Sequence, residues 1–276
     1  MTKKITIAID AMGGENSPKK NIEGLNMFLK KNKSNDFFIH LYGDEKRIKK
    51  ELSLVNASTE NIKIIHSEGV VSDEESPMKA VKSSKNTSMW NSVSAQVDGN
   101  ADISLSAGNT GVLLVISRMI LKMMKEVSKP ALAGLWPSKK GMTVVLDLGA
   151  NIECDEKNLV DFSEMGSALF KSIFPDITPK VSLLNIGSEE IKGTEMLKKA
   201  FNKLKTLENN NFVFNGYIEG NKLMDGDSNV VVTDGFTGNI ALKTAEGTAK
   251  FIIDNLKISL TENIFSKFSL IFSYFS

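Results

Sequence analysis

The chain has 276 residues, a formal net charge of +1 and an apolar share of 41%. This length allows one large α/β domain or two smaller ones, and the near-zero charge argues against a nucleic-acid-binding protein. Because Cys154 is the only cysteine, an intrachain disulfide and a cysteine-rich metal site are excluded, which suits a reducing cytoplasm. The first apolar run breaks at Asp10 and predicts a strand, not a signal peptide. The sequence contains no run of roughly 18 uncharged apolar residues, so it does not predict a membrane-spanning helix.

Apolar periodicity and turn residues divide the chain into alternating strands and helices. This alternation predicts an α/β fold with a largely parallel sheet. The segment 122–140, with two prolines and several lysines, is a candidate boundary between two lobes. In chain order we expect a strand at 5–9, a helix at 18–29, a strand at 37–42, a helix at 45–54, a strand at 62–65, helices at 77–85 and 87–97, a strand at 103–105, a helix after Gly111, a strand at 143–148, a helix at 159–174, a strand at 181–186, a helix from Gly187 through Leu204, and strands at 212–214 and 230–232.

The most informative stretch is 229–248, which reads NVVVTDGFTGNIALKTAEGT. Three consecutive valines predict a buried strand, the segment from Asp234 to Asn239 predicts a turn with two glycines, and helical spacing resumes at Ile240. Glycines let a ligand approach the backbone closely, and the free N–H groups at a helix N-terminus attract anions. The stretch therefore predicts an anion site, although an ordinary strand-to-helix connection has the same pattern. It matches neither GxxxxGK[ST] nor GxGxxG.

Five predicted strands end in glycine together with short polar residues. In a parallel sheet the carboxyl ends of strands share one edge, where ligands bind. Glycine, Asn and Asp also make ordinary turns, but five such ends favour a shared cleft. The five groups are Asp10/Gly13/Gly14, Ser106/Gly108/Asn109, Asp147/Gly149/Asn151, Asn185/Gly187/Glu189 and Asp234/Gly235/Gly238/Asn239.

The predicted cleft contains few of the usual catalytic side chains. His40 and His66 lie in or beside apolar strands, which favours core or edge positions. No Gly-x-Ser-x-Gly elbow exists, and the acidic residues around Asp147 lack metal-site spacing, so solvated acidic turns explain most of them. Cys154 has only Lys157 as a basic neighbour, which does not indicate an activated thiol. Such a site suits a nucleophile that needs no activation, and inorganic phosphate is one that helix N-termini hold well.

Six motifs follow one another along the chain: IAIDAMGGENSP, VVSDEESPMKAVKSSKNTSM, ADISLSAGNTGVLL, DLGAN, LLNIGSEEIKG and VVTDGFTGNIALKTAEG. In this order they resemble the motifs of the PlsX-type phosphate acyltransferases of bacterial phospholipid synthesis. The resemblance runs from about residue 5 to residue 251. It implies acyl transfer from acyl carrier protein to inorganic phosphate, giving acyl phosphate and free carrier. It also implies a Rossmann-like α/β/α sandwich of the isocitrate/isopropylmalate dehydrogenase type, a homodimer, and no metal or cofactor.

The resemblance also suggests roles for individual residues. Catalytic roles fall on Asn109, Asn185, Asn239 and Lys243. Substrate binding falls on Asp10, Gly13, Gly14, Gly108, Thr110, Asn151, Lys192, Asp234, Gly235, Thr237 and Gly238. In this assignment Asp234 orients its loop, while Lys192 and Lys243 offset phosphate charge. The lysines at i, i+3 and i+6 that could meet an acidic carrier protein are Lys79, Lys82 and Lys85; a solvated face has the same spacing.

We expect residues 1–250 to form one α/β acyltransferase domain, which could comprise two lobes, and residues 251–276 an amphipathic helix. Apolar residues recur every four positions from Ile252 to Phe272. Family members continue well past this helix, so the chain resembles a C-terminally truncated member. Such a helix suits an interfacial anchor of a cytoplasmic enzyme that visits the membrane and hands its product to an integral membrane acyltransferase, or equally a dimer or core contact. Two other functions remain open: an inactive scaffold that binds carrier or membrane, and an enzyme like phosphate acetyltransferase.

Overall fold

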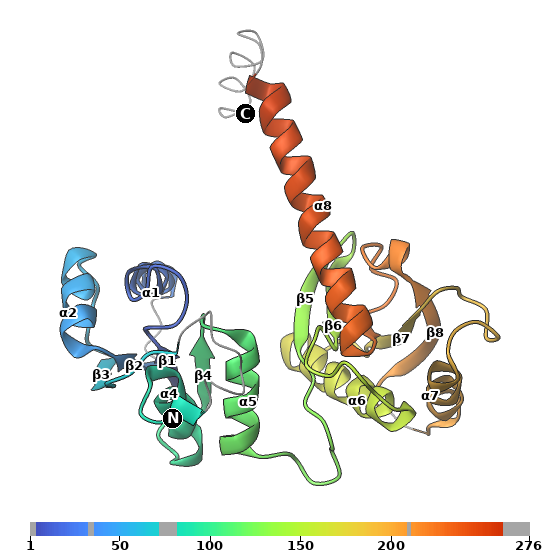
Figure 1. Ribbon diagram of the computed structural model, residues 1–276, viewed down its shortest axis with the longest axis horizontal. Helices are drawn as coiled ribbons and strands as arrows, with labels where there is room; N and C mark the ends of the chain where they lie inside the picture. The colour runs from blue at the N-terminus through green and yellow to red at the C-terminus, as the bar shows by residue number, and fades with distance from the viewer. Residues whose placement is uncertain (1–3, 33–35, 72–81, 209–210, 262–276) are drawn as a thin grey trace. The chain divides into compact units, whose positions relative to one another are not determined.

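The computed structural model describes residues 4–32, 36–71, 82–208 and 211–261. The chain divides into two compact units, Met1–Lys125 and Glu126–Ser276, each with its own sheet (Figure 1). The division lies within the segment 122–140 that the sequence marks as a candidate lobe boundary. That residues 1–250 act as one domain stays a prediction.

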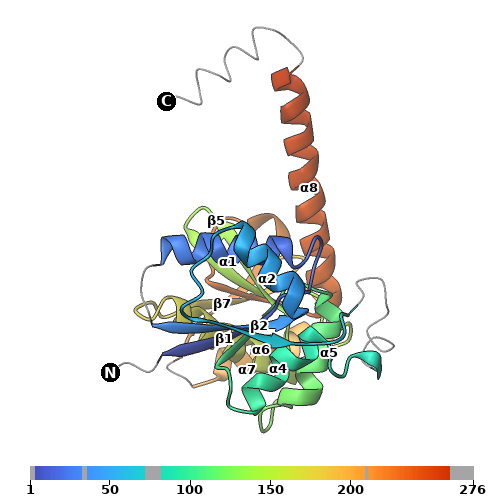
Figure 2. The ribbon, with the colours of Figure 1, turned by 90° about the vertical axis from the view of Figure 1, so that its left-hand side faces the viewer.

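The first unit is a parallel four-stranded sheet in the order β3-β2-β1-β4. Helices cover both faces of this sheet, with α1 and α2 on one face and α4 and α5 on the other (Figure 2). Ile39 belongs to the cluster that includes residues of α1 and α2, while Ala8 packs in a cluster with Ala95 of α4. The elements are β1 (Ile5–Asp10), α1 (Lys19–Lys31), β2 (Phe37–Gly43), α2 (Glu45–Leu54), β3 (Ile62–His66), α4 (Ser88–Val97), β4 (Ile103–Ser106) and α5 (Thr110–Leu121). Most of the helix expected at 77–85 lies outside the described residues.

The second unit is a five-stranded sheet in the order β5-β6-β9-β7-β8. All neighbours are parallel except β5 and β6, which form an antiparallel hairpin. Consecutive β-branched residues place β9 at the centre, where all three of its valines are fully buried. The elements are β5 (Ala133–Ser138), β6 (Gly141–Leu146), α6 (Glu156–Ile173), β7 (Lys180–Asn185), α7 (Glu195–Thr206), β8 (Val213–Glu219), the 3-10 turn η1 (Gly220–Lys222), β9 (Val230–Val232) and α8 (Gly235–Thr261).

Three parts of the second unit differ from the sequence-based expectation. The segment 122–140 contains β5, which lies at the edge of the described sheet and pairs there with β6. An edge strand tolerates Pro137, because proline has no backbone N–H to donate to a second neighbour. The helix expected directly after Gly187 begins only at Glu195, where the Thr194 hydroxyl accepts a hydrogen bond from Leu197 N. Helix α8 begins at Gly235, so the two-glycine segment is the first turn of the helix and not a separate loop.

Among the residues that the structure describes, helix α8 contacts its own unit through its first turns. Ala241, Leu242 and Ala245 pack against a cluster that includes Trp136 and Leu148. From Glu246 to Leu260 every side chain is exposed, and the helix projects from the sheet (Figure 1). The expected amphipathic helix is therefore helical as far as Thr261, and its remainder lies outside the described residues. Among the described helices, none is both long and apolar enough to cross a membrane.

Two glycines in helices provide a matched stability test. A Cβ added to Gly166 of α6 would lie 2.6 Å from Val230 Cγ1, whereas one added to Gly247 of α8 would meet nothing within 4 Å. Gly166→Ala should lower the free energy of unfolding by about 1–2 kcal/mol, because overpacking outweighs helix propensity. Gly247→Ala should raise it by about 0.5–1 kcal/mol. Urea denaturation measures both, and equal effects would contradict this packing of α6 on β9.

Candidate functional site

Two turns meet at the carboxyl ends of β1 and β4 in the first unit. Asp10 is buried, and its carboxylate accepts hydrogen bonds from the Ser106 hydroxyl at 2.7 Å and from Met12 N at 3.2 Å. Gly108 N donates to Ser106 Oγ at 3.1 Å. A Cβ on Gly13 would lie 2.5 Å from Asp10 Oδ2 and 2.8 Å from Gly108 N. Only glycine permits this approach, so Asp10, Gly13 and Gly108 form one cluster.

Helix α5 begins at the same cluster. Asn109 is its N-cap residue and accepts a hydrogen bond from Val112 N at 3.1 Å. Thr110 is the first residue of the helix and is exposed. Gly14 abuts the turn before the helix, since a Cβ there would lie 2.7 Å from Ala107 O. The positive end of the α5 dipole therefore lies at the rim of the sheet, where an anion is stabilised.

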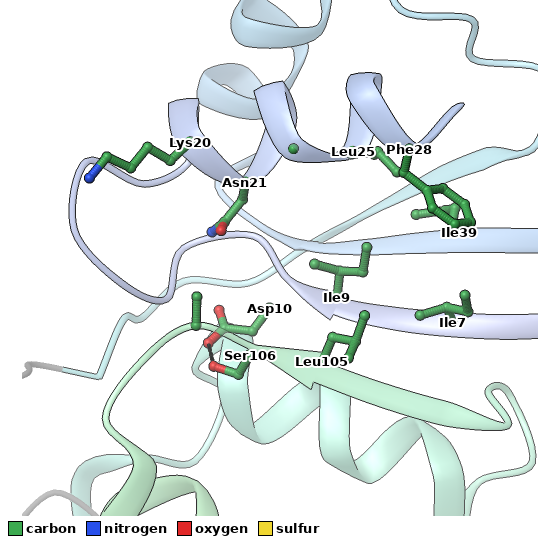
Figure 3. Close-up of a pocket in the computed structure, with 12 residues that line it drawn as sticks. Ile7, Ile9, Asp10, Lys20, Asn21, Leu25, Phe28, Ile39, Leu105 and Ser106 are labelled. Carbon is green, nitrogen blue, oxygen red and sulfur yellow. Dashed lines mark hydrogen bonds between the residues drawn. The ribbon is translucent and has the colours of Figure 1, made fainter. Parts of the chain in front are cut away.

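A cavity of about 390 Å³ extends from this cluster along the sheet beneath α1 (Figure 3). Its polar end contains Asp10, Ser106 and Asn21. The remaining wall is mostly apolar and comes from β1, β2, β4 and α1, through side chains that include Ile7, Ile9, Leu25, Phe28, Ile39 and Leu105.

In the second unit, Asp147 follows β6 and is fully buried. Its Oδ1 accepts hydrogen bonds from the backbone N–H groups of Leu132, Gly149 and Ala150 at 2.8–3.1 Å. Its Oδ2 accepts from Asn151 N at 2.8 Å and Asn151 Nδ2 at 2.7 Å. The interpretation of Asp147 as part of a solvated acidic turn is therefore wrong. The Asp147 carboxylate accepts hydrogen bonds from the backbone amides of this turn, so these amides are not available to a ligand.

The first turn of α8 lies against the Asp147 loop. The Asp234 carboxylate caps the helix by accepting hydrogen bonds from Thr237 N at 2.9 Å and Thr237 Oγ1 at 2.8 Å. Gly235 N donates to Asn151 O at 2.8 Å, and Asn239 Nδ2 donates to Leu148 O at 3.1 Å. Thus Asp234, rather than Thr237 or Asn239, caps the helix, and the latter two side chains remain at the exposed surface of the first turn.

Asn185 ends β7, next to β9 in the sheet. Its side chain is 8% exposed, donates to Lys192 O at 3.1 Å and accepts from Ile186 N at 2.9 Å. Lys192 lies 3.7 Å from Glu189, and on α8 Lys243 lies 2.8 Å from Glu246. Both lysines are exposed, and surface ion pairs of this kind contribute about 1 kcal/mol or less. An incoming anion can therefore compete for either lysine.

The other chemically active side chains are not activated by their surroundings. Burial raises the pKa of the Cys154 thiol above its usual value, which opposes thiolate formation at neutral pH. Burial, followed by the nearby Lys63 charge, lowers the pKa of His40.

Of the three lysines predicted to contact a carrier protein, Lys82 and Lys85 are exposed, while Lys79 lies outside the described residues.

The predicted residues thus form separate groups within the two units. Asp10, Gly13, Gly14, Gly108, Asn109 and Thr110 meet at the ends of β1 and β4. In the second unit the strands β6, β9 and β7 are neighbours, and the segments that follow their carboxyl ends carry Asn151, Asn185, Lys192, Asp234, Gly235, Thr237, Gly238 and Asn239, with Lys243 one turn further along α8. One cleft shared by all five turns stays a prediction. The structural roles of Asp147 and Ser106 were missed, although a strand followed directly by D-x-G is a recognisable signal.

This architecture defines an α/β protein with glycine-rich turns at the carboxyl rims of mostly parallel sheets. A solved structure with a similar fold is the EutD phosphotransacetylase from Staphylococcus aureus, with a TM-score of 0.61 and 17% identity, covering 90% of this chain and 83% of that one.

The family is established by sequence. Residues 5–274 match the family described as fatty acid synthesis protein. The phosphate acyltransferase of Pelagibacter ubique (strain HTCC1062) is 55% identical over 98% of this chain and 80% of its own length. That of Maricaulis maris (strain MCS10) is 40% identical over 97% of this chain and 76% of its own length. The chain belongs to this fatty acid synthesis protein family, and the resemblance seen in its motifs is confirmed.

Proposed function

We propose that the chain transfers a fatty acyl group from acyl carrier protein to inorganic phosphate, giving acyl phosphate for phospholipid synthesis. The chain is an acyltransferase, because it belongs to a family whose relatives of 40–55% identity are named phosphate acyltransferases. The observation that carries the acceptor assignment is this identity, which extends over nearly the whole chain. The rim chemistry agrees with it, since amide side chains and helix N-termini suit an anionic nucleophile.

In the proposed reaction a phosphate oxygen attacks the thioester carbonyl. A carbon–oxygen bond forms, the carbon–sulfur bond breaks, and the carrier leaves as a thiolate that takes up the proton released by hydrogen phosphate. Phosphate is already a nucleophile at neutral pH, so the protein supplies position and stabilises the oxyanion of the tetrahedral intermediate. We assign these roles to Asn109 and Thr110 at the start of α5, and to Asn185, Thr237 and Asn239 in the second unit, where Asn151 contributes by holding the loop after β6. Lys192 and Lys243 offset phosphate charge, and Asp234 orients Thr237 through two hydrogen bonds.

The proposed activity predicts phosphate-dependent release of free carrier thiol from palmitoyl carrier protein. Thiol release should saturate with phosphate and stop when sulfate replaces it. Because burial raises the pKa of the Cys154 thiol, no acyl-enzyme should form at this residue. The Cys154→Ser variant should therefore turn over at the same rate as the unmodified chain, and it removes the protein's own thiol from the assay. Binding of carrier without release would favour an inactive scaffold. Turnover of acetyl-coenzyme A in preference to the carrier substrate would favour a phosphate acetyltransferase.

The basic side chains of the first unit are the proposed contact for the acidic carrier protein. Lys82 and Lys85 are exposed, so reversing both charges with Lys82→Glu/Lys85→Glu should raise KM for acyl carrier about tenfold or more. KM for phosphate should stay unchanged. The matched control is Lys46→Glu/Lys50→Glu, which reverses two exposed lysines on α2 of the same unit. Equal effects of the two pairs on KM for acyl carrier would remove the idea of a specific carrier face.

The exposed part of α8 is the proposed contact for a lipid surface. Phe251 is 68% exposed, Ile252 51% and Leu256 54%, and a helix that exposes apolar side chains over several turns needs a partner. In this proposal the enzyme is a cytoplasmic homodimer that visits the membrane and hands acyl phosphate to an integral membrane acyltransferase.

Vesicles of phosphatidylglycerol should co-sediment the full chain but not a chain that ends at Asp254. The Leu256→Glu variant should also lose binding, because it places a charge among the exposed apolar side chains. The matched control is Thr248→Glu, which adds the same charge at an exposed polar position of α8 and should keep vesicle binding. If these changes alter the mass measured by analytical ultracentrifugation and leave vesicle binding intact, the exposed helix is a dimer contact instead.

A further inference from the structure

The strand end after β6 contains a buried acid that no step of the proposed reaction uses. Asp147 is 0% exposed. In the described part of the chain, its hydrogen bonds come from four backbone N–H groups and one side-chain amide. A buried carboxylate is tolerated only when donors surround it, and hydrogen bonds to a charged acceptor are about twice as strong as neutral ones. This arrangement therefore fixes the backbone of the loop that supplies the donors.

Successive N–H groups that converge on one point form a concave anion site. Here Gly149, Ala150 and Asn151 form such a site, and the Asp147 carboxylate fills it at 2.8–3.0 Å. Gly149 permits the turn with a φ of 133°. The loop is thus ordered by an anion that is covalently part of the chain, so its shape is set before any substrate binds.

The same loop supports the first turn of α8. Asn151 O accepts a hydrogen bond from Gly235 N, and Leu148 O accepts one from Asn239 Nδ2. At Gly238 the two backbones also approach each other closely, because a Cβ there would lie only 1.9 Å from Asp147 O. A shift of the loop would therefore displace Asn239 and the start of α8.

Asn151 is fixed in the same way. Its side-chain amide donates to Asp147 Oδ2 at 2.7 Å and to Pro130 O at 2.6 Å. Both amide hydrogens are used, so the side chain can present only its oxygen to a ligand. A direct donor role for Asn151 is less favoured by this geometry than a role in holding the loop.

We propose that Asp147 is a positioning residue, which acts through the loop 148–151 on Asn239 and the first turn of α8. This assignment rests on the proposed function for its effect on turnover. Its structural half, the transmission from Asp147 to α8, does not depend on that function.

The test is Asp147→Asn, which replaces one acceptor oxygen by an NH2 group facing N–H donors. Hydrogen exchange should accelerate at least tenfold at the amides of 148–151 and also at those of 235–239, while β7 and α7 keep their protection. With phosphate and palmitoyl carrier protein, kcat per folded chain should fall at least tenfold, and KM for acyl carrier should stay unchanged.

Two control variants separate positioning from stability. Asp155→Asn also removes a carboxylate of the second unit but keeps a good N-cap for α6, so exchange at 235–239 and kcat should not change. Phe170→Leu weakens the buried core of α6, so the melting temperature should fall while kcat per folded chain stays the same. If Asp147→Asn does not fold, Asn151→Ala decides, because it removes a single side-chain donor and should still accelerate exchange at 235–239.

Unchanged exchange at 235–239 in a variant whose 148–151 amides are exposed would overturn the proposal. So would a kcat loss no greater than that of Phe170→Leu at matched melting temperature. If the unmodified chain shows no phosphate-dependent turnover, the proposed function fails, but the exchange measurement still decides whether Asp147 controls the start of α8.

Discussion

The central constraint in this molecule is that a buried carboxylate must find hydrogen-bond donors within the protein. Leaving such a charge without partners costs several kcal/mol. Asp10 and Asp147 both meet the constraint at the ends of strands, and in both cases the donors belong to adjacent turns. The turns therefore take the shape that surrounds the acid. In each unit, the turns at the carboxyl ends of the strands are thus arranged around a buried carboxylate of the chain itself.

The glycines follow from the same constraint. When a turn folds around a carboxylate, its backbone comes so near to neighbouring backbone that a Cβ no longer fits. Gly13 lies against Gly108 N, and Gly238 lies against Asp147 O. These glycines hold backbone against backbone, which differs from the role that their pattern first suggests, namely to open the backbone to a ligand. Glycine thus permits close packing of the backbone in these loops, and ligand recognition depends on the polar side chains beside it.

Much of the fold could be predicted because its elements have strong local patterns. The helix predicted at 45–54 matches α2. β5 was missed because Pro137 and the flanking lysines are typical of a linker, and only pairing with β6 makes an edge strand of it. The start of α8 was missed because Gly235 and Gly238 weaken helix propensity, while the Asp234 cap and the contact with Asn151 compensate for this. In each case a partner distant in sequence decided the structure.

The candidate site was predictable as a set of residue types, but not as a set of roles. The sequence suggests Asn151 as a ligand-binding residue, and only the fold shows that both of its amide hydrogens are bound within the protein. Asp147 looked like a solvated acid for a similar reason, since burial depends on β5 and on α8. Short motifs name the groups present at a rim, whereas hydrogen-bond partners determine which of those groups are still free to act.

Because the buried and capping carboxylates already bind backbone amides, the attraction of an anionic ligand needs another source. A phosphate dianion near the rim of the second unit would meet the field of Asp147 and Asp234, and several of the backbone amides there are already bound to those acids. Attraction must then come from cations. Within the described residues, Lys192 and Lys243 are exposed, and each forms a surface ion pair with one glutamate. A doubly charged ligand competes well against one carboxylate for each lysine. Geometry would thus come from fixed amide side chains such as Asn185, and charge compensation from lysines that can change partners.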